Sequence, residues 1–252
     1  MIEVIKARTL AEAHESIIKY ILENGYYLYT EDKEHTVETD TIAAFIDTPF
    51  RLPRTSPYAP QKEMAAKEYA RQLIEGSSNE FDYTYHDQLF KWEEYYIHGH
   101  KIVHNQVQYL IDKLKELPES RRAVAIVFDP SKHQYTDKSV PCLQLMQLSY
   151  RQNRLNMKVV FRSNDMLTAS GLNMYGLTEL QKFIAGKLEY PVGSYTHIAL
   201  IPHIYYIRDS KDMITMTDGI NEDFKQKNMT DTVKIQKWIL DGIEKFSKTG
   251  GI

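Results

Sequence analysis

Four apolar segments in the second half of the chain restrict its fold most strongly. They are rich in β-branched and aromatic residues, a composition typical of strands. The segments are "RRAVAIVFD" (121–129), "CLQLMQLSYRQ" (142–152), "RLNMKVVFRS" (154–163) and "YTHIALIPHIYYI" (195–207). "RQNRL" (151–155) reads as a tight turn, so 142–162 is predicted to form a hairpin. "NMYGLTELQKFIAGKLE" (173–189) is predicted to form a helix between the last two strands.

The first half of the chain is mainly helical in pattern. Thr9 begins a predicted helix over 9–27, with Glu12 at the capping-box position and Gly25 as the stop. Its apolar stripe consists of Ile17, Ile18, Ile21 and Leu22. A strand is expected over 36–50, and further helices over 59–76 and 102–120.

No repeat and no Gly/Ser linker divides the chain, so one α+β domain over 1–252 is the simplest interpretation. Its C-terminal part, about 213–252, is predicted to be a charged helical extension. The amphipathic helix within that extension is centred on Ile235, Trp238, Ile239 and Ile243.

Composition excludes several classes of protein. One cysteine in 252 residues excludes an internal disulfide, and a net charge of −3 argues against a protein that coats nucleic acid. No window approaches the roughly 20 apolar residues of a membrane span, so a cytoplasmic location is expected. Glycine-rich nucleotide loops, paired CxxC and HExxH are absent. His98, His100 and His104 fit a solvated surface better than a metal site, so no metal is expected.

Polar side chains gather where the predicted strands end. An arginine beside a serine, as at Arg162 and Ser163, suits a phosphate, and an arginine near Cys142 favours the thiolate form. Each residue also has an ordinary explanation: an inert buried thiol, an Arg162–Asp165 ion pair, or Asn173 as a helix cap. Spacing alone leaves Cys142 undecided. The full set is Cys142, Arg162, Ser163, Asn164, Asp165, Asn173, His203 and Tyr205.

Taken together, these motifs resemble the thymidylate synthase family. The resemblance is carried by "PC" (141–142), "FRSND" (161–165), "LNMYGL" (172–177) and "THIALIPHIYY" (196–206), with "SRRAVA" (120–125) and "YTY" (83–85) in support. It spans roughly 8–207 and is nearest to the compact archaeal-type members, in which "LQL" also follows the cysteine. It implies a mixed β-sheet packed with helices, with one sheet face forming a homodimer interface.

The resemblance implies a role for each matched residue. Cys142 would be the nucleophile that adds to C6 of a pyrimidine nucleotide, so that C5 attacks 5,10-methylenetetrahydrofolate, the co-substrate. Arg162 and Ser163 match the phosphate-binding pair, and Asp165 matches the aspartate that orients the pterin. Asn173 matches the asparagine that reads the base edge. His203 and Tyr205 match the pair that holds the sugar hydroxyl.

Other matches concern the partner subunit and proton transfer. Arg121 and Arg122 match arginines that this family lends across the dimer to the partner's phosphate, and Lys33 lies near the position of a further phosphate arginine. Glu68 matches a glutamate that manages protons around the base, with Glu63 as its rival. Tyr85 matches a tyrosine near the nucleophile.

The departures from the family pattern lie mostly on the folate side. Leu143 replaces a histidine common after the cysteine, although the compact archaeal members share it. His86 replaces a glycine and would bring an imidazole close to the cleft. Ala169 stands where a glycine usually lines the folate site.

Three functions follow, of which methylation of dUMP to dTMP is preferred. Asn173 can donate to O4 and accept from N3–H of uracil, whereas an aspartate there is known in deoxycytidylate hydroxymethylases. The alternative is 5-hydroxymethylation of CMP, dCMP or dUMP, with water in place of hydride. A catalytically silent relative that binds a nucleotide or RNA is disfavoured, because Cys142, Arg162 and Asp165 are all present.

Overall fold

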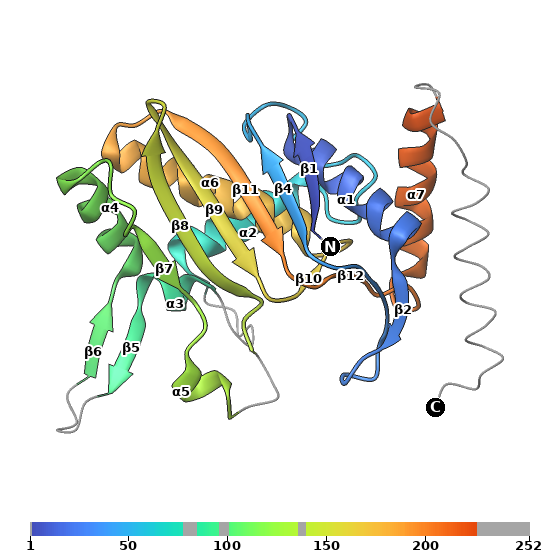
Figure 1. The fold of residues 1–252 in the computed structure, drawn as a ribbon, viewed down its shortest axis with the longest axis horizontal. Helices are drawn as coiled ribbons and strands as arrows, with labels where there is room; N and C mark the ends of the chain where they lie inside the picture. Colours follow the sequence, from blue (N-terminus) through green and yellow to red (C-terminus); the bar gives the residue numbers. More distant parts are fainter. Residues whose placement is uncertain (1, 78–84, 96–100, 136–139, 226–252) are drawn as a thin grey trace.

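The computed structural model describes residues 2–77, 85–95, 101–135 and 140–225, and its centre is a six-stranded mixed sheet (Figure 1). In spatial order the strands are β1 (Glu3–Ala7), β4 (Ile42–Ile46), β11 (Val192–Ala199), β9 (Arg154–Phe161), β8 (Leu143–Arg151) and β7 (Val124–Ile126). The pairs β1–β4 and β11–β9 are parallel, and the other neighbouring pairs are antiparallel.

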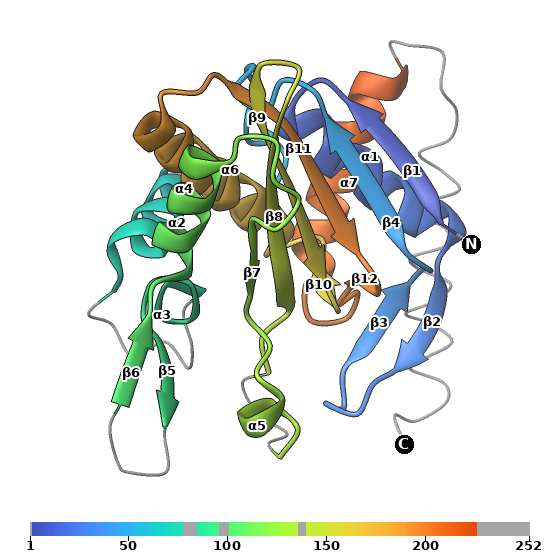
Figure 2. The ribbon, with the colours of Figure 1, turned by 60° about the vertical axis from the view of Figure 1, so that its left-hand side comes forward.

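A smaller sheet continues from the end at which β9 and β11 finish (Figure 2). Its strands are β10 (Asn164–Asp165), β12 (Pro202–Ile204), β3 (His35–Glu38) and β2 (Tyr26–Tyr29), and a separate hairpin joins β5 (Trp92–Tyr95) to β6 (Lys101–His104). The chain passes from β9 into β10 and from β11 into β12, and these two short strands pair in parallel. The polar segments that follow β9 and β11 therefore lie side by side.

Helices cover one face of the large sheet, apart from the short α5 (Pro130–His133), which lies beyond the end of β7 (Figures 1 and 2). The others are α1 (Leu10–Asn24), α2 (Glu63–Glu75), α3 (Tyr85–Phe90), α4 (Gln106–Glu116), α6 (Ser170–Leu188) and α7 (Ser210–Lys225). The central one, α6, contacts α1, α2 and α4 as well as β9 and β11. Every residue from Asn173 to Thr178 is buried, so this part of the helix is enclosed on all sides, whereas Lys182, Gly186 and Lys187 nearer its C-terminal end are exposed.

Local signals account for the elements that were predicted correctly. Thr9 caps α1 by accepting a hydrogen bond from the backbone N–H of Glu12 at 3.1 Å, and Gly25 ends the helix. The β8–β9 hairpin turns at Gln152 and Asn153, both with positive φ, as a two-residue type I′ turn requires.

Several predicted boundaries are wrong. The single strand expected over 36–50 is two strands, β3 and β4, which belong to different sheets, and 195–207 is likewise divided into β11 and β12. The helix expected from residue 102 begins at Gln106, since β6 occupies 101–104 and the Asn105 side chain caps α4. The helix α6 begins at Ser170, three residues before the predicted start.

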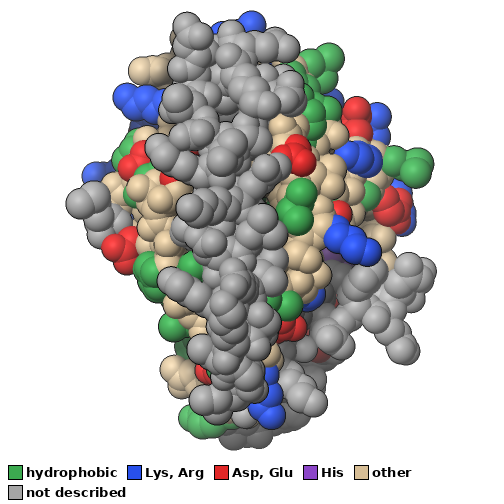
Figure 3. Space-filling view, turned by 90° about the vertical axis from the view of Figure 1, so that its right-hand side faces the viewer, with side chains coloured by type: hydrophobic (Ala, Val, Ile, Leu, Met, Phe, Trp, Pro, Cys, Tyr) green, Lys and Arg blue, Asp and Glu red, His purple; other side chains and the backbone are tan. Residues whose placement is uncertain are grey.

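One hydrophobic core runs from β1 to α7, and it includes Met213, Met216 and Ile220. The start of the expected C-terminal extension is therefore packed into the core, whereas Ile235, Trp238, Ile239 and Ile243 lie outside the described residues. Within the described ranges, no helix is long and apolar enough to cross a membrane. On the face drawn in Figure 3, the described basic and acidic side chains are interspersed.

Candidate active site

A cleft of about 660 Å³ opens where β8, β9 and β12 meet the helices α2, α3 and α6. Its volume suits a small-molecule ligand. The lining includes most of the residues singled out from the sequence: Glu68, Tyr85, Cys142, Arg162, Ser163, Asp165, Ala169, Asn173, His203 and Tyr205.

Three side chains hold the backbone around Cys142, one of which, Gln144, donates from Nε2 to the carbonyl of Pro141 at 2.7 Å. The Arg162 guanidinium donates from Nε to the carbonyl of Pro141 at 3.2 Å and from Nη2 to that of Val140 at 2.9 Å. On the other side, the N–H of Leu143 donates to the Tyr85 hydroxyl at 3.3 Å. Arg162 therefore binds the segment leading to the thiol, and the ion pair considered between Arg162 and Asp165 does not form.

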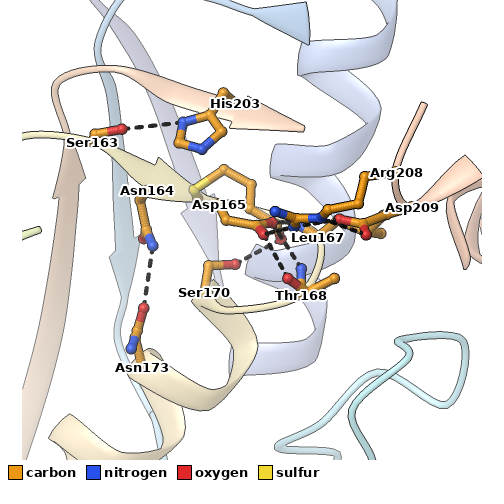
Figure 4. A network of polar contacts seen from close by, with 11 residues as sticks. Ser163, Asn164, Asp165, Leu167, Thr168, Ser170, Asn173, His203, Arg208 and Asp209 are labelled. Atoms are coloured by element: carbon orange, nitrogen blue, oxygen red, sulfur yellow. Dashed lines mark hydrogen bonds and ion pairs between the residues drawn. The ribbon is translucent and has the colours of Figure 1, made fainter. Parts of the chain in front are cut away.

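His203 and Ser163 form a pair on one wall of the cleft (Figure 4). The Ser163 hydroxyl lies 3.2 Å from Nδ1 of His203, and the His203 ring meets the edge of Tyr205 with centroids 4.9 Å apart. Burial lowers the pKa of His203, so the imidazole is neutral near pH 7. A neutral imidazole beside a hydroxyl and a phenol is a suitable set for a sugar hydroxyl.

Asn173 lies in the first turn of α6 and is buried, so it is not the helix cap considered from the sequence. Its Oδ1 accepts from Nδ2 of Asn164 at 3.1 Å (Figure 4), and its Nδ2 donates to the Tyr69 hydroxyl at 2.9 Å. Asn164 and Tyr69 also line the cleft. Sequence reasoning gave neither of them a role, although Asn164 stands within the motif "FRSND".

Asp165 uses both carboxylate oxygens (Figure 4). Oδ1 accepts from the N–H groups of Leu167 and Thr168 at 3.0 Å each, and Oδ2 accepts from the Thr168 hydroxyl and from Nη2 of Arg208 at 2.9 Å. The Arg208 guanidinium also lies 3.8 Å from the centre of the Tyr205 ring. Arg208 was not predicted, and it links the residue expected to bind the pterin with one expected to bind the sugar.

The geometry favours Glu68 over Glu63 as the proton-managing glutamate, because Glu68 lines the cleft and Glu63 does not. Arg71 and Gln72 donate hydrogen bonds to Glu68, and they lower the pKa of its carboxyl to about 2. Gln72 also lines the cleft, and its position four residues after Glu68 on the same helix face marks it in the sequence.

Other expected residues lie away from the cleft. Lys33 is exposed in the β2–β3 turn, where Asp32 is the residue that lines the cleft, and Arg121 and Arg122 are exposed just before β7. The imidazole of His86, expected close to the cleft, is instead buried: its Nδ1 lies 3.1 Å from the Leu73 carbonyl oxygen and its ring stacks on Phe90.

The described residues contain no group of three or more His, Cys, Asp or Glu side chains placed to hold a metal ion.

Comparisons with known proteins show which family the chain is similar to. Residues 62–236 match the family model described as "Thymidylate synthase", a range that includes α2, α6 and α7. A protein of Methanocaldococcus jannaschii named "Putative thymidylate synthase" is 40% identical over 209 residues, which cover 81% of this chain and 91% of the relative. One of Methanosarcina barkeri with the same name is 31% identical over 80% of this chain and 89% of its own length. The chain belongs to the thymidylate synthase family.

Proposed function

We propose that the protein methylates dUMP to dTMP, with 5,10-methylenetetrahydrofolate as the co-substrate. The observation that carries this proposal is the convergence of Cys142, Arg162, Ser163 and Asn173 on one cleft, although they lie next to the ends of two different strands and in a helix. A thiol nucleophile, a phosphate-binding pair and a base-reading amide are the three groups that covalent activation of a pyrimidine nucleotide requires.

Arg162 is suited to hold the nucleotide phosphate and the nucleophile together. A guanidinium has five N–H donors, and the two bonds to the carbonyls of Val140 and Pro141 use two of them. The others are available to a phosphate in the planar geometry that arginine offers. The same positive charge lowers the cost of ionising Cys142, because an adjacent cation stabilises a thiolate.

The reaction then follows from thiolate addition. Cys142 Sγ bonds to C6, and the electron pair moves to C5, which bonds to the methylene carbon of the folate as the bond from that carbon to N10 breaks and N10 takes the electron pair. The C5 proton passes to a base, and N5 of the folate then departs with the electron pair of its own bond to the methylene carbon. Hydride from the folate reduces the exocyclic methylene to a methyl group, and Sγ leaves C6. In this proposal Asn173 holds the base edge throughout, and proton transfer at the base is assigned to Glu68, which lines the same cleft.

We propose further that the functional unit is a homodimer formed by the open face of the large sheet. One row of paired residues crosses all six strands on this face, and every member is apolar: Val4, Ala43, Ile198, Val160, Leu145 and Ile126. Val4 and Ile126, at its ends, are 56% and 48% exposed. Such a row is typical of a buried interface. Arg121 and Arg122, next to β7, would reach the partner's phosphate.

Hydroxymethylation is the second candidate, favoured by the folate side of the cleft. Asp165 is engaged by Arg208, and Ala169 adds a methyl group where the family usually has glycine. If these features displace the pterin, water reaches the exocyclic methylene before hydride does. The product is then a 5-hydroxymethyl nucleotide, and the released co-product is tetrahydrofolate.

One experiment separates the two products. The purified protein is incubated with 5,10-methylenetetrahydrofolate and dUMP, dCMP, UMP or CMP, and the products are weighed by mass spectrometry. Methylated dUMP with dihydrofolate supports the proposal, whereas a hydroxymethyl product with tetrahydrofolate contradicts it. A Cys142→Ser variant should lose turnover and keep nucleotide binding, and unchanged turnover would rule out covalent catalysis by this thiol.

A further inference from the structure

A line of hydrogen bonds leads from the interior of the protein to the amide of Asn173. The Tyr195 hydroxyl lies 2.9 Å from Nδ1 of His197, and Nε2 of His197 lies 2.8 Å from Oδ1 of Asn164. Nδ2 of Asn164 then donates to Oδ1 of Asn173 at 3.1 Å, and Nδ2 of Asn173 donates to Tyr69 at 2.9 Å. Tyr195, His197 and Asn164 are at most 2% exposed.

The direction of the line is determined at Tyr195 and passed on by a neutral His197. Burial, aided by His14, lowers the pKa of His197 to about 3, and a neutral imidazole donates from one nitrogen and accepts at the other. Among the described residues, Nδ1 of His197 is the only hydrogen-bond partner of the buried Tyr195 hydroxyl, so this O–H would be unpaired if it did not donate there. Tyr195 therefore donates to Nδ1 and Nε2–H donates to Asn164, so the carbonyl oxygen of Asn164 faces the histidine and its NH₂ faces Asn173.

The orientation of the Asn173 amide matters because uracil and cytosine are opposites at the edge that it reads. Uracil presents an N3–H donor and an O4 acceptor, whereas cytosine presents an N3 acceptor and an N4–H donor. An asparagine matches one base or the other depending on which way its amide is turned. Turning Asn173 alone would set the NH₂ of Asn173 against that of Asn164, leaving buried donors unpaired.

We propose that Tyr195, His197 and Asn164 are positioning residues, which fix the direction of the Asn173 amide and thereby make the site select uracil over cytosine. This inference rests on the proposed function, in which Asn173 reads the base. It assigns base selection to a line of four residues, of which only Asn164 and Asn173 line the cleft.

Two substitutions test the line by opposite means. An ionised Asn164→Asp side chain only accepts, so both His197 and Asn173 must donate to it, and the Asn173 amide turns over. Tyr195→Phe removes the hydroxyl that determines which nitrogen of His197 carries the proton, without touching the cleft. Ser170→Ala is the matched control, because Ser170 is a buried polar residue on α6 that donates to the Met166 carbonyl and takes no part in the line.

The measurement is the ratio of dissociation constants, dCMP over dUMP, by titration calorimetry without folate, with thermal melting to confirm folding. We expect the ratio to fall about tenfold or more in Asn164→Asp and several-fold in Tyr195→Phe, with Ser170→Ala unchanged. A ratio unchanged in Tyr195→Phe overturns the inference. A change confined to Asn164→Asp also overturns it, since the new carboxylate then acts on the base directly.

Binding separates this inference from the proposed function. If the wild-type protein binds dCMP more tightly than dUMP, the proposed substrate is wrong. Tyr195→Phe still decides the role of the line in that case, because loosening the Asn173 amide then raises the ratio instead of lowering it.

Discussion

At the scale of single residues, the carboxylate of Glu68 is the group whose ionisation the structure most clearly controls. Arg71 is the first cause of its low pKa, so Arg71→Gln should raise the pKa of Glu68 from about 2 towards the ordinary range of glutamate. A step that needs the ionised carboxylate persists to low pH in the wild type and is lost at higher pH in the variant. The measurement is the acid limb of kcat/KM against pH.

The control for that prediction is Lys67→Gln, which removes the partner of Glu63 outside the cleft. Its acid limb should match that of the wild type. If Arg71→Gln also leaves the limb in place, Glu68 does not govern it, and the assignment of Glu68 as the proton-managing glutamate is wrong.

Arg162→Lys keeps a positive charge but loses the planar fork that spans two carbonyls. An ammonium cannot bind the carbonyls of Val140 and Pro141 and a phosphate in the same geometry. We expect kcat for dUMP to fall by about ten- to a hundredfold, with a smaller loss in binding, since each buried bond lost costs about 1–3 kcal/mol. Single-turnover rates and calorimetry measure the two separately. A loss of binding with kcat unchanged would mean that the fork serves binding alone.

Sequence alone predicted the residues with chemistry and missed their partners. Cys142, Arg162, Ser163 and Asp165 stand in short recognisable motifs, and all four line the cleft. Tyr69 and Arg208 stand in no such motif. Their roles depend on contacts with residues that are 104 and 43 positions away in the sequence. No local pattern specifies such pairs, which are fixed by how α2 and α7 pack.

At the scale of elements, the contact between α2 and α6 positions Tyr69. A Cβ added at Gly176 would lie 2.6 Å from a carbon of the Tyr69 ring, closer than packed atoms approach. Gly176→Ala should therefore displace Tyr69, lower the free energy of unfolding by about 1–3 kcal/mol and weaken binding of dUMP. Urea unfolding and calorimetry provide the two measurements.

The same helix supplies a control at Gly186, where an added Cβ meets nothing within 4 Å. Gly186→Ala should raise the free energy of unfolding by about 0.5–1 kcal/mol, because alanine is the better helix former. Stabilisation by both substitutions would contradict the close packing described for Gly176.

Helices and turns that are specified by neighbouring residues could be predicted from the sequence. The division of two predicted strands between different sheets could not. The α1 cap and the two-residue turn of the β8–β9 hairpin are specified by neighbouring residues. The breaks at 39–41 and 200–201 are not, because the residues on both sides have similar strand propensity. What separates β3 from β4 and β11 from β12 is their choice of distant partner strands.

At the scale of the whole molecule, buried histidines make stability depend on pH. Burial lowers the pKa of His14, His197 and His203 below the ordinary value of 6.5. The unfolded chain therefore binds protons that the folded chain refuses, and the free energy of unfolding falls as pH drops below about 6.5. Each such histidine contributes up to about 1.4 kcal/mol per pH unit in that range.

His14→Gln should reduce the pH dependence of the free energy of unfolding by the contribution of one histidine. Gln is chosen because it can still donate to the Met166 carbonyl that His14 contacts. Urea unfolding at pH 7.5 and 5.5 measures the difference. An identical difference in His14→Gln and in the wild type would show that His14 is protonated equally in both states.

The two carbonyl bonds of Arg162 have a consequence for which molecules can react at all. If this guanidinium binds the phosphate, one rigid planar group connects the 5′ end of the substrate to the backbone of Val140 and Pro141, the two residues before Cys142. The position of the bound phosphate then fixes the distance between the Cys142 sulfur atom and C6 of the base. A nucleoside lacking that phosphate would sit in the cleft without being aligned for attack, so saturating concentrations would not restore its rate.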